Sequence, residues 1–233
     1  EEDFDVLFFG TSHMKYGILP MELWHDYGIV SYNLGTNLQL LPTTYWQMEN
    51  VLEYTSPRLV VIDCFFLTST GNISTSAHDS FDGLPFSKTK LDALSDLIGD
   101  GENGYTYGEF LWNYSIFHNR WNELEEKDFK NTVIDTKGGE YMIEIESGPG
   151  LEPVSRENKL EEDTSAVIYL QKMIEDCQKR GIEVLLVYMP VLAWEESPME
   201  ANRVYEIAEQ YGVNYVNFLD MDILWRDAFE GEF

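Results

Sequence analysis

Three short segments of the chain place polar residues directly after apolar runs. They are Gly10-Thr11-Ser12-His13, Asn33-Leu34-Gly35-Thr36-Asn37 and Asp63-Cys64. Gly10 permits a tight turn that would leave the Ser12 hydroxyl exposed as a candidate nucleophile. Gly35 and its neighbouring amides are candidate donors to a developing oxyanion, and Asp63 is a candidate for orienting a hydroxyl or a donor. If the three segments meet, they would place a candidate nucleophile beside candidate oxyanion donors.

Each segment also has a purely structural interpretation. Ser12 is suited to cap a following helix, which is a common use of serine after a strand. Asn33 and Gly35 are ordinary turn residues, and the structural alternative for Asp63 is that it only begins a loop. Spacing alone favours the cap for Ser12 and the turn for Asn33 and Gly35, and it leaves Asp63 undecided.

The elements that must position these segments alternate between strands and helices. Uninterrupted apolar runs such as Val6–Phe9 and Leu59–Ile62 are typical of strands that are covered on both faces, as in parallel sheets. We expect strands at Asp5–Phe9, Ser31–Leu34, Leu59–Asp63, Glu183–Tyr188 and Asn214–Phe218. We expect helices at Pro20–Tyr27, from Pro42 to about Tyr54, at Thr164–Arg180 and at Met199–Tyr211. The sequence therefore predicts a single α/β domain over residues 1–233 with a doubly wound, mainly parallel five-stranded sheet. In such sheets, ligands bind at the carboxyl ends of the strands.

The alternation is interrupted between about residues 64 and 163, which we interpret as an insertion after the third strand. Two helices are expected in it, at Lys88–Ile98 and Tyr107–Trp121. The pair Gly138-Gly139 separates Thr132–Asp135 from Glu140–Glu146, a pattern that predicts a β-hairpin.

Charge and cysteine content exclude several classes of function. The chain has 15 Lys and Arg against 42 Asp and Glu, a net charge of −27, which argues against nucleic acid and anionic membranes as partners. Hydrophobic residues make up 44%, so this charge surrounds a real core. Cys64 and Cys177 lack metal-ligand spacing and are expected as buried thiols. We expect no metal and no cofactor.

Together the three segments resemble those of the SGNH/GDSL hydrolases, and most closely a bacterial branch whose first block reads Gly-(Ser/Thr)-Ser-His. The similarity extends over most of the chain, through Tyr32-Asn33-Leu34-Gly35, Leu59-Val60-Val61-Ile62-Asp63, His118-Asn119-Arg120-Trp121 and Val187-Tyr188-Met189-Pro190. It implies a flavodoxin-like fold and a nucleophilic Ser12. It also implies oxyanion donors from the amides of Ser12 and Gly35.

The chain departs from the family pattern at two places. The usual Asn of the third block is replaced by Asp63 and Cys64, so Asn33 or Asn37 would have to supply its amide. The family's Asp-x-x-His after the fifth strand has no counterpart, because all four histidines precede residue 119. We therefore expect that the natural protein continues beyond Phe233. Within this chain His118 is a better candidate for a substitute base than His13, since neighbouring side chains such as Ser12 and His13 diverge on a helix. A structural role for His118, or ligand contact through Arg120 and Trp121, is nevertheless favoured over a catalytic one.

The resemblance leads to an expected function. It implies a serine esterase or O-acyltransferase that acts on acyl groups, with acetyl expected, of a cell-surface or secreted glycan, with a possible N-terminal membrane anchor outside this chain. Further substrate contacts are expected from His13, Asp63, His118, Arg120 and Trp121. The alternative is a catalytically inactive carbohydrate-binding module with the same fold.

Overall fold

The structure is a computed structural model that describes residues 4–73, 77–99, 104–111, 123–125, 136–140, 154–190 and 196–220. Five parallel strands form one sheet in the order β2-β1-β3-β4-β5. The strands are β1 (Val6–Phe9), β2 (Ser31–Asn33), β3 (Leu59–Asp63), β4 (Glu183–Tyr188) and β5 (Asn214–Asn217). The predicted doubly wound parallel sheet is confirmed, and every predicted strand lies within one residue of its observed bounds.

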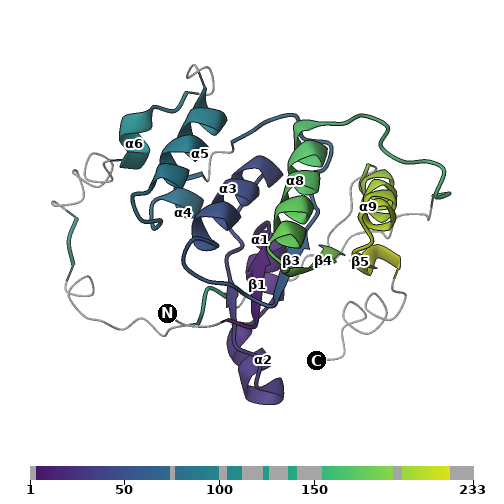
Figure 1. Ribbon diagram of the computed structural model, residues 1–233, viewed down its shortest axis with the longest axis horizontal. Coiled ribbons are helices and arrows are strands. Elements are labelled where there is room, and N and C mark those ends of the chain that lie inside the picture. Colours follow the sequence, from purple (N-terminus) through teal and green to yellow (C-terminus); the bar gives the residue numbers. More distant parts are fainter. Residues whose placement is uncertain are drawn as a thin grey trace.

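Helices connect the strands and fill the insertion (Figure 1). Between β1 and β3 they are α1 (Ser12–Gly17), α2 (Pro20–Tyr27) and α3 (Leu41–Val51). The insertion contains α4 (Ala77–Phe81), α5 (Lys88–Ile98) and α6 (Tyr107–Leu111). The later helices are α8 (Ser165–Lys179) and α9 (Ser197–Tyr211), followed by a short 3-10 helix at Phe218–Asp220. The sequence did not predict α4, because five residues are too few to show a helical period.

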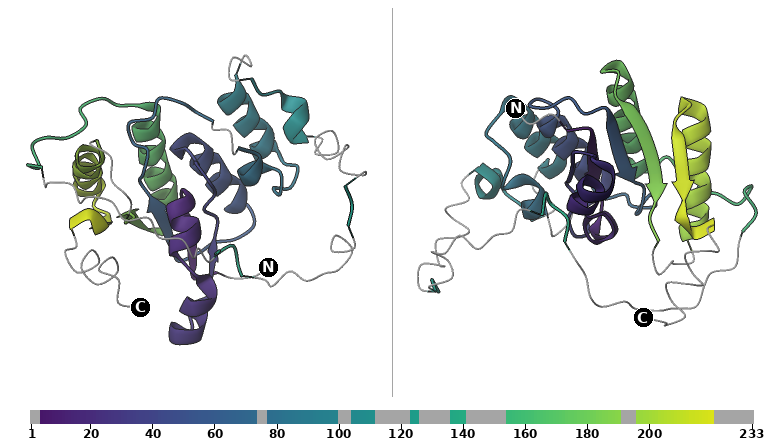
Figure 2. Two further views of the ribbon diagram at one scale, coloured as in Figure 1. Left: turned by 180° about the vertical axis from the view of Figure 1, so that it is seen from behind. Right: turned by 90° about the horizontal axis from the view of Figure 1, so that it is seen from below.

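The two faces of the sheet are covered by different helices. The chain moves one way from β1 to β2 and the other way in every later connection, so right-handed crossovers place α1 and α2 on one face and α3, α8 and α9 on the other. Figure 2 shows α8 and α9 beside each other along β4 and β5. The strand residues on the α3 and α8 face are Leu7, Phe9, Val60, Ile62, Val184 and Leu186. The opposite face packs Phe8, Val61 and Val187 against Met14 of α1 and Leu23 of α2.

The insertion builds a second, smaller hydrophobic cluster beyond α3. In Figure 1 its helices α4, α5 and α6 lie together at one end of the molecule. Their apolar side chains pack mainly on one another, and the buried ones are Ala77, Phe81, Ala93, Leu94, Leu97, Ile98 and Phe110. Of the predicted hairpin, the structure describes only residues 136–140, where Lys137 and Gly138 form a turn with positive φ. The expected helix end between 112 and 121 lies outside the described residues.

Within the described ranges, no helix has the length and apolar character needed to cross a membrane.

Candidate functional site

The turn between β1 and α1 holds Ser12 at the carboxyl end of β1. Thr11, and not Ser12, is the N-cap of α1, because the Thr11 side chain accepts a hydrogen bond from the amide of His13 at 3.2 Å. The alternative that Ser12 only caps the helix is therefore wrong. Thr11 is the residue of this turn that sequence reasoning missed, although a threonine before a short helix is itself a cap signal.

A buried carboxylate from the neighbouring strand supports this turn. Asp63, the last residue of β3, is 1% exposed and lies directly beneath Gly10. A Cβ atom on Gly10 would lie 2.4 Å from the Cβ of Asp63, and Gly10 has a φ of +150°, so only glycine fits there. The adjacency of β1 and β3 in the sheet thus brings residues 10 and 63 together.

Asp63 accepts three hydrogen bonds from this region. Its Oδ2 accepts from the hydroxyl of Thr11 at 2.7 Å and from the Thr11 amide at 3.3 Å, and its Oδ1 accepts from the amide of Phe65 at 3.3 Å. Burial raises the pKa of Asp63 above its ordinary value, while His13 and the three donors act in the opposite direction. The predicted orienting role for Asp63 therefore has a clear geometric basis, through Thr11.

His13 lies on the same side of the turn as Asp63. Its Nδ1 atom is 3.0 Å from the hydroxyl oxygen of Thr11, and its ring packs edge-on against Phe65 with 4.6 Å between centroids. Burial lowers the pKa of His13 below its ordinary value, and the nearby Asp63 opposes that change. The lowered pKa favours the neutral form of the imidazole.

Ser12 is exceptional within the turn. The Thr11 amide and the amides of His13, Met14 and Lys15 all donate hydrogen bonds there. By contrast, neither the hydroxyl nor the amide of Ser12 makes a hydrogen bond within the part of the chain that the structure describes, and the residue is half-buried. A hydroxyl that is left available can attack a carbonyl carbon, and an available amide can donate a hydrogen bond to the oxygen that becomes negative.

The loop after β2 lies against this turn but uses its own polar groups internally. The Asn33 side chain donates to the carbonyls of Met14 at 2.8 Å and Ile18 at 2.9 Å, and its Oδ1 accepts from the Gly35 amide at 3.0 Å. The hydrogen bonds of the buried Asn33 side chain thus link β2 to α1. The two predicted oxyanion residues are brought to the Ser12 turn, with the Gly35 amide paired to Asn33.

Gly35 is needed because the two loops approach so closely. A Cβ atom at this position would lie 2.8 Å from the Lys15 nitrogen and 3.0 Å from the Thr11 carbonyl oxygen. Asn37 is the other amide side chain of the loop, and it makes no hydrogen bond to any residue that the structure describes. The side-chain amide of Asn37 is therefore available as a donor, whereas that of Asn33 is occupied.

A second buried acid, Glu200, bonds to residues at and beyond the carboxyl ends of β4 and β3. Glu200 of α9 is 4% exposed and accepts from the amide and hydroxyl of Thr68, both at 2.7 Å, and from the hydroxyl of Tyr188 at 2.8 Å. Burial raises the pKa of Glu200. Tyr188 in turn packs against Phe65, whose ring contacts His13. No sequence pattern pointed to Glu200, because its partners lie far away along the chain.

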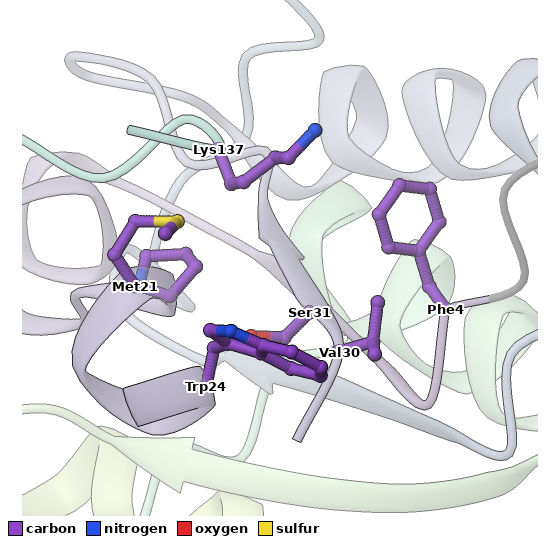
Figure 3. Close-up of a pocket in the computed structure, with 7 residues that line it drawn as sticks. Phe4, Met21, Trp24, Val30, Ser31 and Lys137 are labelled. Carbon is purple, nitrogen blue, oxygen red and sulfur yellow. The ribbon is translucent and has the colours of Figure 1, made fainter. Parts of the chain in front are cut away.

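A pocket of about 350 Å³ lies elsewhere, beside the first residue of β2 (Figure 3). Met21 and Trp24 of α2 face Phe4 and Val30 across it, as Figure 3 shows. Its other lining residues are Pro20, Ser31 and Lys137. Because it lies at the amino end of β2, it does not belong to the site at the carboxyl ends of the strands.

Some predicted contacts fall outside the described residues, namely His118, Arg120 and Trp121. In the described ranges, no group of three or more metal-ligating side chains comes together. Cys64 and Cys177 are free and buried. Burial raises the pKa of Cys64, so this thiol beside Asp63 stays protonated.

In comparisons with known proteins, no protein-family model matches the chain, and no curated protein is significantly similar to it.

Proposed function

We propose that the protein is an SGNH-type serine esterase or O-acyltransferase in which Ser12 is the nucleophile. Its substrate would be an acyl ester, with the acetyl group of a cell-surface or secreted glycan as the expected case. The hydroxyl of Ser12 attacks the ester carbonyl, and the Ser12 amide donates to the oxygen that becomes negative. Water or a sugar hydroxyl then takes the acyl group from Ser12.

One observation carries the proposal: neither the hydroxyl nor the amide of Ser12 makes a hydrogen bond within the described residues, whereas the amides of Thr11 and His13 on either side of it do. The turn is held from below by a buried carboxylate and from the side by the Gly35 loop. These contacts fix the position of the Ser12 side chain, which makes no hydrogen bond of its own within the described residues. Positioning of this kind is what a nucleophile requires.

A second candidate, the non-catalytic carbohydrate-binding module, is favoured by the Gly35 amide. That amide donates to Asn33 and is not available to an oxyanion in this arrangement. A module of this kind would bind an acylated sugar at the strand ends without turnover.

The test is hydrolysis of p-nitrophenyl acetate by the protein as its gene encodes it. Ser12→Ala is expected to lower kcat/KM by at least about 10³-fold, because the nucleophile is lost. The matched control is Ser95→Ala, at an exposed position of α5, which should leave the rate unchanged. Equal rates for the protein and Ser12→Ala would remove Ser12 from the mechanism, and saturable binding of an acetylated glycan without turnover would favour the module.

A further inference from the structure

We propose that His13 is the proton acceptor of this site and that Asp63 holds it in the required tautomer through the hydroxyl of Thr11. The proposal rests on the esterase function proposed above and names the group that activates its nucleophile. It departs from the expectation that His118 is the better substitute base within this chain.

The tautomer follows from counting protons along the hydrogen-bonded chain. The Thr11 hydroxyl has one proton, which it donates to Oδ2 of Asp63 at 2.7 Å. Its oxygen must therefore accept in the 3.0 Å contact with Nδ1 of His13, so that Nδ1 carries the proton of the neutral ring. The remaining nitrogen, Nε2, then has a free lone pair and can act as a base.

The surroundings of the ring fix its orientation. Phe65 packs against the imidazole at an interplanar angle of 84°, and the amide of Phe65 is itself bonded to Asp63. Nε2 makes no hydrogen bond to a residue within the described ranges, and His13 is only half-buried. One side of the ring is thus held by protein, and the basic nitrogen is left for a reacting group.

The proton transfers balance without any co-reactant other than water or an alcohol. As Oγ of Ser12 forms a bond to the carbonyl carbon, its proton passes to Nε2, and the same proton then goes to the departing alcohol oxygen. In the second half, water attacks the acyl carbon, gives its proton to Nε2, and Ser12 recovers it as the acyl bond breaks. Neighbouring helical side chains diverge, so we expect one water molecule between Ser12 and His13.

In this chain of contacts Asp63 and Thr11 are positioning residues. When Nε2 accepts a proton, the ring becomes positive while Nδ1 still donates to Thr11, whose hydroxyl points to the carboxylate of Asp63. The buried carboxylate therefore stabilises the charged ring. Thr11→Val removes the link and keeps the side-chain volume, whereas Thr11→Ser keeps the link.

The first test reads the tautomer directly in the wild-type protein and needs no activity. Imidazole ¹⁵N NMR at pH 7 should show His13 with its proton on Nδ1, and Thr11→Val should remove this preference while Thr11→Ser retains it. A proton on Nε2 in the wild-type protein would overturn the proposal.

The second test separates this proposal from the function on which it rests. His13→Gln should lower kcat for p-nitrophenyl acetate by about 10²–10⁴-fold, and His13→Gly should recover part of the rate when imidazole is added. His78→Gln, at the other half-buried histidine among the described residues, is the control and should keep the wild-type rate. If Ser12→Ala abolishes hydrolysis and His13→Gln does not slow it, His13 is not the base although the esterase function stands. If Ser12→Ala has no effect, the function itself fails.

Discussion

The strand-end turn and the insertion each contain a half-buried histidine beside an acid and an aromatic ring. In the insertion, Nδ1 of His78 is 2.9 Å from Asp82, four residues away on the same segment, and the ring stacks on Phe110. At the strand ends, His13 reaches an acid that is fully buried and comes from another strand, through Thr11. The first arrangement is local and stabilises a short helix. The second depends on strand pairing in the sheet and lies beside Ser12, which makes no hydrogen bond within the described residues. For this reason we propose a function for the second arrangement and not for the first.

The largest expected difference between the two regions concerns glycine. Gly10→Ala should lower the free energy of unfolding by about 3 kcal/mol, because the new methyl group overlaps Asp63 and the backbone has positive φ. Gly83→Ala in the insertion meets no atom within 4 Å and should change stability by less than about 1 kcal/mol. Urea unfolding measures both values. Equal losses in the two variants would show that the turn is not tightly packed on Asp63.

The next difference concerns the two acids. Asp63→Asn places an amide nitrogen or a weaker acceptor opposite buried donors and should cost about 2–3 kcal/mol of stability. Asp82→Asn affects a partly exposed pair and should cost about 1 kcal/mol or less. Thermal and urea unfolding of the two variants give the comparison, and a cost for Asp82→Asn as large as that for Asp63→Asn would contradict it.

The smallest expected effect is a pH dependence of stability that belongs to His13. Its pKa is lowered on folding, so below pH 6.5 the unfolded chain binds this proton before the folded chain does. The wild-type protein should therefore lose stability relative to His13→Gln as the pH falls from about 6.5, with Asp63 reducing the effect. Urea unfolding at pH 7.5 and pH 5.5 measures it. A stability difference that stays constant over this interval would show that His13 is not desolvated.

Much of the fold could be predicted from local patterns. Apolar runs located all five strands, since such runs suit a sheet covered on both faces, and glycine after Arg180 and Tyr211 marked the ends of two helices. α4 could not be predicted, because it is held by packing of Ala77 and Phe81 in the insertion and has no period of its own.

The site was harder to predict than the fold. The places of Ser12, Gly35 and Asp63 after strands make them candidates, but the sequence does not show that Thr11 bonds to Asp63, 52 residues away. The sequence predicts Asn33 as an oxyanion donor, and only the packing of α1 on β2 reveals its bonds to Met14 and Ile18. Contacts between side chains from different strands depend on strand order and register, which no short motif records.

The most direct test of the central claim is covalent labelling of Ser12. The protein and Ser12→Ala would be treated with a fluorophosphonate, which reacts with activated serines, and then mapped by peptide mass spectrometry. We predict one adduct on the peptide that contains Gly10 to Lys15, at Ser12, and none in Ser12→Ala. The assignment of Ser12 as the nucleophile would be contradicted if the protein hydrolyses esters but the fluorophosphonate labels a different serine. It would also be contradicted if the protein hydrolyses esters and no serine is labelled.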